Sequence, residues 1–244
     1  MRKQIAYFYT LKSLYRKQLA IATAFSKQHD YQKFILLSSP RCGSTLLHTY
    51  LNANPQIHSL GEEPWRDAEW KISRDYFPAY PKLIRSSGFK VFYLFQSIAP
   101  YRSLYRKLTA TQNLKVIHLS RENLLEQYLS FKQAWQHRTW SQSGPKQPDQ
   151  PMIKLEKDEF EAFKNEQQRQ KTQCLMDFSQ QDICPITYED LTEQPDKTLR
   201  LVQEFLGVKP RRLVSLLEKQ QQLTLEEILI NAREVKEWFP EYFE

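Results

Sequence analysis

Cysteine and glycine are scarce in this chain of 244 residues, and it has no long apolar run. Its three cysteines, Cys42, Cys174 and Cys184, are too few and too scattered for a disulfide framework or for a zinc site, which usually shows paired C-x-x-C spacing. No stretch of about 18 apolar residues occurs, so we expect no membrane-spanning helix. The N-terminal segment interrupts its apolar positions with Lys and Arg too often for a signal peptide. These absences favour a cytoplasmic protein.

Positive charge is in excess, with 35 Lys and Arg against 28 Asp and Glu and a formal net charge of +7. This balance favours an anionic ligand, an anionic membrane surface or nucleic acid, without choosing among them. With 41% hydrophobic and 13% aromatic residues, the chain can bury one sizeable core, which disfavours a disordered protein. No repeat or composition break divides it, so we expect one domain over residues 31–244 and an extension over residues 1–30.

The N-terminal extension is basic and amphipathic. Its apolar residues recur at three- and four-residue spacing with Lys and Arg between them, which predicts a helix over residues 1 to about 28. Two interpretations stay open: a helix packed on the core, and a helix that rests on an anionic membrane as a peripheral contact.

Short apolar runs alternate with longer helical patterns along the rest of the chain. Runs of mainly β-branched, aromatic or leucine residues predict buried parallel strands at 33–38, 89–94, 114–119 and 183–187. Helical periodicity predicts helices at 45–53, 101–111, 122–138 and 157–179. This alternation indicates an α/β fold, a single domain with a parallel sheet flanked by helices, whose ligands bind at the carboxyl ends of the strands.

Residues 141–151 read SQSGPKQPDQP, a polar stretch rich in proline and glutamine. Such composition is typical of a surface loop rather than a helix or strand. We interpret it as a flexible loop that can close over a substrate.

The most informative segment, residues 33–45, runs from an apolar strand through a polar loop into a helix. Gly43 allows a tight turn, and the hydroxyls of Ser44 and Thr45 add donors to the backbone N–H groups at the positive end of the helix. Arg41 adds a full positive charge. This pattern predicts an anion-binding loop.

Two familiar phosphate loops are disfavoured by spacing. The ATP-hydrolysing G-x-x-x-x-G-K-[ST] loop needs a second glycine and a lysine that this segment lacks. A cysteine-based phosphatase would need an arginine where the chain has His48, six residues after Cys42. We therefore interpret Cys42 as a small packed residue rather than a nucleophile.

Residues 40–45 read Pro-Arg-Cys-Gly-Ser-Thr. This run resembles the first signature, Pro-[Arg/Lys]-x-Gly-[Ser/Thr]-[Ser/Thr], of the sulfotransferases that use 3′-phosphoadenosine 5′-phosphosulfate (PAPS). The resemblance implies a P-loop-like parallel sheet and PAPS as the co-substrate, with no metal. It also implies that the 5′-phosphosulfate is bound by Arg41, Cys42, Gly43, Ser44 and Thr45.

Arg121 follows the strand predicted at 114–119, and Ser130 lies on the helix after it. In the family, an arginine and a serine so placed grip the 3′-phosphate, and the resemblance implies this role for both residues. Here Ser130 stands one residue further from Arg121 than in many members. The alternative is an Arg-Glu pair that begins an exposed helix.

The segment 184–208 resembles the late family pattern of a strand, Tyr-Glu-Asp-Leu, a proline and a helix that ends in Phe-Leu-Gly. Its apolar periodicity supports that helix, and Gly207 is well placed as the residue that ends it. The resemblance implies that Tyr188 lies near the adenine. We interpret Glu189 and Asp190 as residues that organise the turn.

Glu62 and Glu63 stand between a glycine and a proline after the first helix. In glycan and tyrosylprotein sulfotransferases a glutamate in this setting is the general base, and we favour Glu63, with Glu62 as its competitor. Adjacent carboxylates can also be plain surface charge.

Lys90 can assist at the sulfuryl group if its side chain points into the cleft, and the alternative is a strand lysine that faces solvent.

His48, His58 and His118 have no spacing that suggests a metal site or a nucleophilic triad. We expect each to be a surface or core histidine, so no metal is predicted.

Together these residues predict an enzyme that moves the sulfuryl group from PAPS to a hydroxyl acceptor, a carbohydrate or a glycolipid. The acceptor class rests on glutamate standing where the cytosolic small-molecule sulfotransferases use histidine, and on the basic N-terminal helix. Two alternatives stay open: a nucleotide-dependent kinase of the same fold, and a non-catalytic anion-binding protein attached to nucleic acid or acidic lipid. Basic residues spread among acidic ones, without an RNA-binding aromatic signature, argue against a nucleic-acid partner.

Overall fold

The computed structural model describes residues 27–28, 30–62, 77–99, 101–136, 152–215 and 224–243. Most of the predicted N-terminal helix and the whole loop 141–151 lie outside this part of the chain. Strand β1 (Lys27–Gln28) pairs antiparallel with β4 (Tyr80–Pro81). The prediction of a helix up to about residue 28 is therefore wrong at its end, where this pairing holds the backbone extended.

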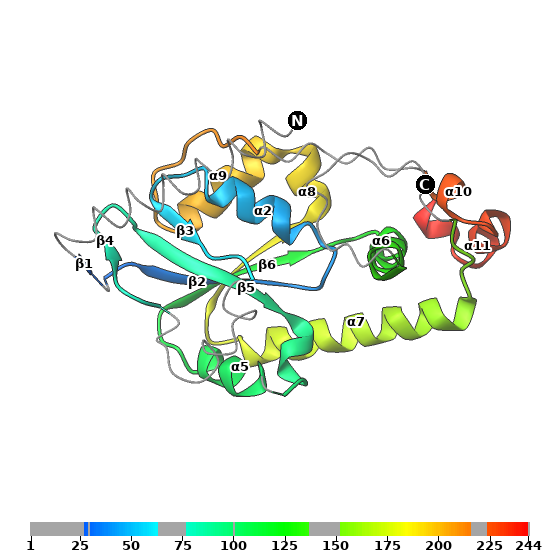
Figure 1. Ribbon diagram of the computed structural model, residues 1–244, viewed down its shortest axis with the longest axis horizontal. Coiled ribbons are helices and arrows are strands. Elements are labelled where there is room, and N and C mark those ends of the chain that lie inside the picture. The colour runs from blue at the N-terminus through cyan, green and yellow to red at the C-terminus, as the bar shows by residue number, and fades with distance from the viewer. Residues whose placement is uncertain are drawn as a thin grey trace.

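A parallel sheet of five strands, in the order β3-β5-β2-β6-β7, lies at the centre of the molecule (Figure 1). Its strands are β2 (Gln32–Ser38), β3 (Ile57–Ser59), β5 (Ser86–Phe92), β6 (Leu114–Ser120) and β7 (Asp182–Thr187). The four strands predicted from apolar runs are confirmed. The near-continuous burial of β2 and β6 is typical of strands covered on both faces.

One predicted strand differs in its bounds. The strand expected at 89–94 begins earlier, at Ser86, and ends at Phe92. It pairs with β2 up to Ser38↔Phe92, where β2 itself ends, so the pairing stops there. Tyr93–Gln96 form the short 3-10 helix η1 instead.

Helices cover both faces of the sheet, with α2, α8 and α9 above it and α5 and α7 below it in Figure 1. Their bounds are α2 (Ser44–Leu51), α5 (Tyr101–Thr109), α6 (Leu124–Gln136), α7 (Lys157–Asp177), α8 (Tyr188–Glu193) and α9 (Pro195–Phe205). One apolar core lies between the sheet and each helical layer. Helix α9 is followed by Gly207 at φ 70°, as predicted for the residue that ends it.

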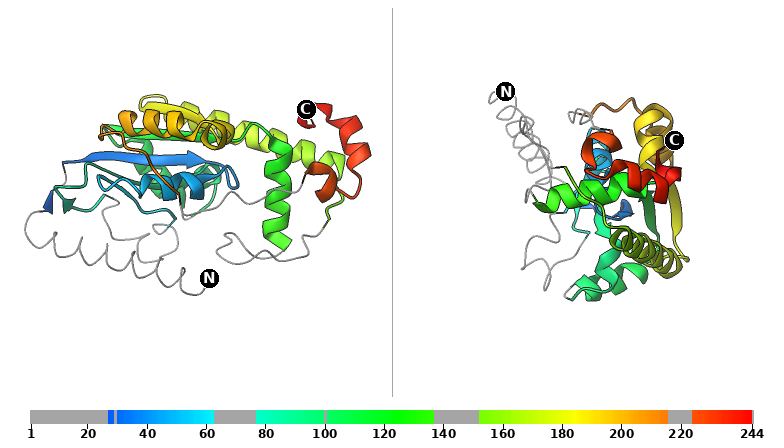
Figure 2. Two further views of the ribbon diagram at one scale, coloured as in Figure 1. Left: turned by 90° about the horizontal axis from the view of Figure 1, so that it is seen from above. Right: turned by 90° about the vertical axis from the view of Figure 1, so that its right-hand side faces the viewer.

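A third apolar cluster joins α6 and α7 to the C-terminal elements. These elements are α10 (Leu225–Ile228), α11 (Ala232–Trp238) and the 3-10 helix η2 (Pro240–Tyr242). Figure 2 shows α6 standing across the end of the sheet, with α10 and α11 beyond it. In the described ranges, no helix combines the length and the apolar character that crossing a membrane requires.

The carboxyl ends of the parallel strands meet at one edge of the sheet, the edge that α6 crosses (Figures 1 and 2). Strand β2 lies in the middle, with β5 on one side and β6 on the other. In such a sheet the connections from neighbouring strands diverge at this point and leave room for a ligand. The turns after β2, β6 and β7 are therefore expected to form one site.

Candidate active site

The turn from β2 into α2 depends on Gly43. This residue precedes Ser44, the first residue of α2, and has φ 81°, in the left-handed region that glycine adopts at little cost. A Cβ atom at Gly43 would lie 2.5 Å from Cδ2 of Tyr188. Arg41 also has a positive φ, 67°, which non-glycine residues rarely adopt outside functional turns. The loop is thus an unusually tight strand-to-helix corner, as the sequence predicted.

Polar residues of α6 and α7 hold this loop in place. Gln127 Nε2 donates to Ser39 Oγ at 2.9 Å and to the Pro40 carbonyl at 2.8 Å. Ser39 Oγ also donates to the side chain of Gln167 on α7. Because Ser39 and Gln127 are both buried, these bonds fix the loop without help from solvent.

Cys42 lies in the apolar core between the sheet and helices α2, α8 and α9, and it is 1% exposed. Burial raises the pKa of its thiol to about 12, so the thiol stays protonated at neutral pH. This confirms that Cys42 is a packed residue, and only its backbone is available to a ligand.

The corner between β6 and α6 meets the β2–α2 corner directly. Arg41 Nε donates to Ser130 Oγ at 2.9 Å, and Arg121 Nη1 lies 3.5 Å from the carbonyl of Arg41. The structure therefore brings the three predicted donor-binding residues together, although Ser130 contacts Arg41 rather than Arg121. Burial and the neighbouring Arg121 guanidinium lower the pKa of Arg41. Two guanidinium groups this close repel each other, and an anion between them would relieve that repulsion.

Tyr188, at the start of α8, lies between the two corners. Its ring contacts the backbone at Gly43, and the Arg121 guanidinium lies over it with Cζ 4.6 Å from the ring centroid. The ring thereby supports Arg121 by a cation–π contact and packs closely against Gly43 of the loop.

Glu189 caps the start of α6. Its carboxylate accepts hydrogen bonds from the backbone N–H groups of Glu122 at 3.1 Å and Asn123 at 3.4 Å. The start of α8 is held by Thr187, whose Oγ1 accepts from the Asp190 backbone N–H at 3.0 Å. The Glu189 side chain organises a turn, as predicted, whereas Asp190 takes part in its turn through its backbone. Because the N–H groups before α6 already have this partner, an anion at the corner would rely on side chains more than on the helix terminus.

Lys90 faces into the site rather than into solvent. Its side chain is 4% exposed, and Nζ donates to Thr45 Oγ1 at 3.0 Å and to Glu62 Oε1 at 3.2 Å. The solvent-facing alternative for this strand lysine is thereby excluded. Glu62 is 37% exposed and lies on the same side of the sheet as α2, whereas Glu63, the glutamate favoured from the sequence, lies outside the described residues. A lysine, a hydroxyl and a carboxylate thus stand together beside the anion-binding loop.

The three histidines in the described part of the chain make hydrogen bonds or ring contacts typical of structural residues. His48 Nδ1 bonds Ser59 Oγ at 2.8 Å, and the His58 ring packs edge-on against Tyr80. His118 Nε2 bonds the Tyr93 hydroxyl at 2.6 Å below the sheet. Among the residues that the structure describes, no group of three or more His, Cys, Asp or Glu side chains is arranged to hold a metal.

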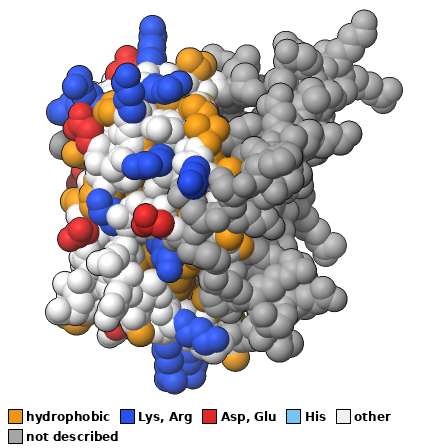
Figure 3. Space-filling model, turned by 90° about the vertical axis from the view of Figure 1, so that its left-hand side faces the viewer, with side chains coloured by type: hydrophobic (Ala, Val, Ile, Leu, Met, Phe, Trp, Pro, Cys, Tyr) orange, Lys and Arg blue, Asp and Glu red, His pale blue; other side chains and the backbone are white. Residues whose placement is uncertain are grey.

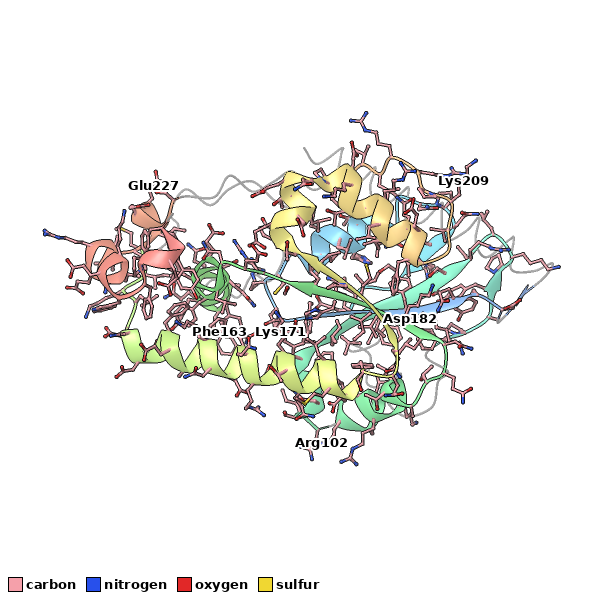
Figure 4. The ribbon with its side chains drawn as sticks, turned by 180° about the vertical axis from the view of Figure 1, so that it is seen from behind. Arg102, Phe163, Lys171, Asp182, Lys209 and Glu227 are labelled. Atoms are coloured by element: carbon pink, nitrogen blue, oxygen red, sulfur yellow. The ribbon has the colours of Figure 1, made fainter. Side chains whose placement is uncertain are left out.

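His118 makes the stability of the fold depend on pH. It is 4% exposed, and burial together with the charge of Lys171, which lies on α7 (Figure 4), lowers its pKa from 6.5 to about 4. The unfolded chain therefore takes up this proton first as the pH falls. We expect the free energy of unfolding to decrease by up to about 3 kcal/mol between pH 6.5 and pH 4 on this account.

The variant His118→Gln removes this titration while leaving a hydrogen-bonding group for Tyr93. Denaturant unfolding at several pH values should give a flatter slope in this range for the variant than for the wild type. An unchanged slope would show that other groups cause the loss of stability.

The sequence missed two polar residues of the site, Glu126 and Gln127. Neither belongs to a motif, and only their place in the first turns of the helix after Arg121 distinguishes them. Glu126 forms an ion pair with Arg121, and Gln127 holds the loop as described above.

Known proteins resemble this chain in sequence and in fold. The chain is 27% identical over 229 residues to Nodulation protein H of Rhizobium tropici, covering 85% of this chain and 89% of the relative. It is 28% identical over 228 residues to Nodulation protein H of Rhizobium meliloti strain 1021, covering 85% and 91%. The crystal structure of a sulfotransferase from Alicyclobacillus acidocaldarius shares the fold, with a TM-score of 0.50, 15% identity, and coverage of 86% of this chain and 90% of that one.

A family defined by the sulfotransferase domain matches residues 31–227, which is most of the chain. The match includes both strand-to-helix corners, Lys90 and Tyr188. The protein therefore belongs to the sulfotransferase domain family.

Proposed function

We propose that the protein transfers the sulfuryl group of PAPS to a hydroxyl group of a carbohydrate or glycolipid. The observation that carries this proposal is the contact between the two corners, in which Arg41 bonds Ser130 and Arg121 approaches the carbonyl of Arg41. PAPS has anionic groups on both the 5′ and the 3′ side of its ribose. Two basic corners that touch can bind one such nucleotide, whereas separated corners could not.

Each corner would hold one end of the donor. The turn at residues 43–45, with Arg41, would bind the 5′-phosphosulfate, and Arg121 and Ser130 would bind the 3′-phosphate. Tyr188, which lies between the corners, would contact the adenine. Because the loop is held by buried hydrogen bonds, this site needs little rearrangement to bind its ligand.

Glu62 is our candidate for the general base, with Glu63 as its competitor. Transfer forms a bond between sulfur and the acceptor oxygen and breaks the bond between sulfur and the 5′-phosphate oxygen. The phosphate leaves with the electron pair, and the acceptor proton passes to the glutamate. Lys90 lies between Glu62 and Thr45 of the loop, so its charge can stabilise the oxygens of the group in transit.

We also propose a class of acceptor and a location for the protein. Glutamate as the base, rather than histidine, favours a glycan acceptor. A cytoplasmic location, with peripheral membrane contact through the basic residues before Lys27, would bring the enzyme to a lipid-linked acceptor.

The non-catalytic alternative requires one large basic patch. Figure 3 shows the face at the amino-terminal ends of the strands; in its described part, Lys and Arg side chains are separated by neutral ones with some Asp and Glu among them. Lys90 and Arg121 are instead buried at the opposite edge, where they suit a small anionic ligand.

The variant Arg121→Ala tests the role of the second corner. It should weaken binding of 3′-phosphoadenosine 5′-phosphate (PAP), the product of the donor, by roughly 1.5–3 kcal/mol, the scale of hydrogen bonds to a charged group. Calorimetric titration measures this affinity, and transfer from labelled PAPS to a panel of oligosaccharides measures activity. PAP affinity that is undiminished in the variant would remove Arg121 from the donor site, and wild-type protein that transfers no label to any hydroxyl acceptor would argue against the proposed activity.

A further inference from the structure

Arg121 is a buried cation whose hydrogen bonds are incomplete. It is 6% exposed, and its Nε atom is buried without a hydrogen-bond partner in the described part of the chain. Its Nη1 atom is at the limit of hydrogen-bonding distance from the Arg41 carbonyl, and Nη2 is paired with the carboxylate of Glu126. Because an unsatisfied donor on a buried cation is costly, this side chain is suited to bind a further oxyanion.

Glu126 is the acidic residue in the first turn of α6. Its backbone N–H donates to Asn123 Oδ1 at 2.9 Å, which fixes the start of the helix independently of the Glu126 side chain. The side chain is 35% exposed, and among the described residues Arg121 is the one hydrogen-bond or ion-pair partner recorded for its carboxylate. The carboxylate can therefore leave Arg121 and enter water without disturbing the helix.

We infer that Glu126 controls the affinity of this corner for anions by occupying Arg121 until a 3′-phosphate displaces it. This inference rests on the proposed binding of PAPS. Glu126 satisfies one nitrogen of the guanidinium and leaves Nε for the ligand. A phosphate dianion can bond both nitrogens and also reach Ser130, so it outcompetes one carboxylate.

Displacement of Glu126 has two consequences for binding. Nucleotides that carry a 3′-phosphate bind less tightly than they would to an unoccupied Arg121, and the ion pair forms again when PAP leaves, which favours product release. A nucleotide without a 3′-phosphate, such as AMP, leaves the ion pair intact, so its affinity does not depend on Glu126. The ion pair with Glu126 also hinders the binding of simple anions, such as inorganic phosphate, to Arg121.

The variant Glu126→Gln tests the inference, because it removes the competing charge and keeps the size of the side chain. We expect the Kd for PAP to fall by at least about fivefold, the equivalent of one weak ion pair, and the Kd for AMP to stay the same. Inorganic phosphate should compete with PAP more strongly in the variant than in the wild type. Calorimetric titrations at one fixed ionic strength measure all three quantities.

The matched control is Glu122→Gln, which removes an exposed negative charge from the same corner. The Glu122 backbone N–H bonds Glu189, and no ion pair joins its side chain to a described residue. Glu122→Gln should change the Kd for PAP by less than about twofold, since exposed charges interact weakly through water. An equal gain in both variants would mean that net charge alone controls binding and would overturn the inference.

An unchanged or higher Kd for PAP in Glu126→Gln would also overturn the inference, because the role of Glu126 would then be only to orient Arg121. An experiment in which the inference fails can be told apart from one in which the proposed function fails. If the protein does not bind PAPS as proposed, the wild type would bind PAP no more tightly than AMP, and Glu126→Gln would leave the ratio of the two affinities unchanged.

Discussion

Replacing Glu62 by glutamine should lower turnover by at least about 100-fold, the usual scale for loss of a general base, while the affinity for PAP stays almost the same. Glutamine cannot accept the acceptor proton, but it has nearly the same size and can still bond Lys90. Steady-state rates with labelled PAPS, together with PAP titration, separate the two effects.

The neighbouring glutamate provides the control for this experiment. Glu63→Gln should keep at least half of the wild-type turnover if Glu62 is the base. A large loss in Glu63→Gln with full activity in Glu62→Gln would transfer the role to Glu63, the residue favoured by the sequence pattern. Full activity in both variants would exclude a glutamate base at this turn.

Replacing Gly43 by alanine should abolish most nucleotide binding. The new Cβ would lie 2.5 Å from the Tyr188 ring, and the residue would be held at φ 81°, a conformation that costs alanine about 1 kcal/mol or more. Because Tyr188 also supports Arg121, the clash would displace both corners. We expect PAP affinity to fall by at least about tenfold, with a lower melting temperature.

Gly207→Ala separates strain from the clash. Gly207 has a similar φ, 70°, but a Cβ there would meet no atom within 4 Å. This variant should lose about 1 kcal/mol of stability and bind PAP normally. If Gly43→Ala bound PAP as well as Gly207→Ala does, close contact between the loop and Tyr188 would not matter for binding.

The sequence predicted the sheet well because its strands are buried on both faces. Strands β2 and β6 are apolar along most of their length, and the turn between β2 and α2 has a glycine at a position of positive φ. Strand β3 has three residues, which is too short for a detectable pattern. The end of β5 is set by the end of its neighbour β2, and a pattern within one segment does not contain that information.

The residues of the candidate site also fall into two groups: those that the local sequence predicts, and those whose contacts depend on tertiary packing. Residues in turns at strand ends were predictable, because anion binding needs particular residue types there. The contact between Arg41 and Ser130, and the ion pair of Arg121 with Glu126, depend on how α6 packs across the end of the sheet. The direction of the Lys90 side chain likewise depends on which face of β5 packs against α2. These features come from tertiary structure.

One titration tests most directly whether a single nucleotide spans both corners. PAP and AMP differ in the 3′-phosphate, the group that Arg121 and Ser130 are proposed to bind. Calorimetry on the wild-type protein should show that PAP binds about 10- to 100-fold more tightly than AMP, the equivalent of roughly 1.5–3 kcal/mol. Equal affinity for the two nucleotides would contradict the claim that the two corners form one donor site.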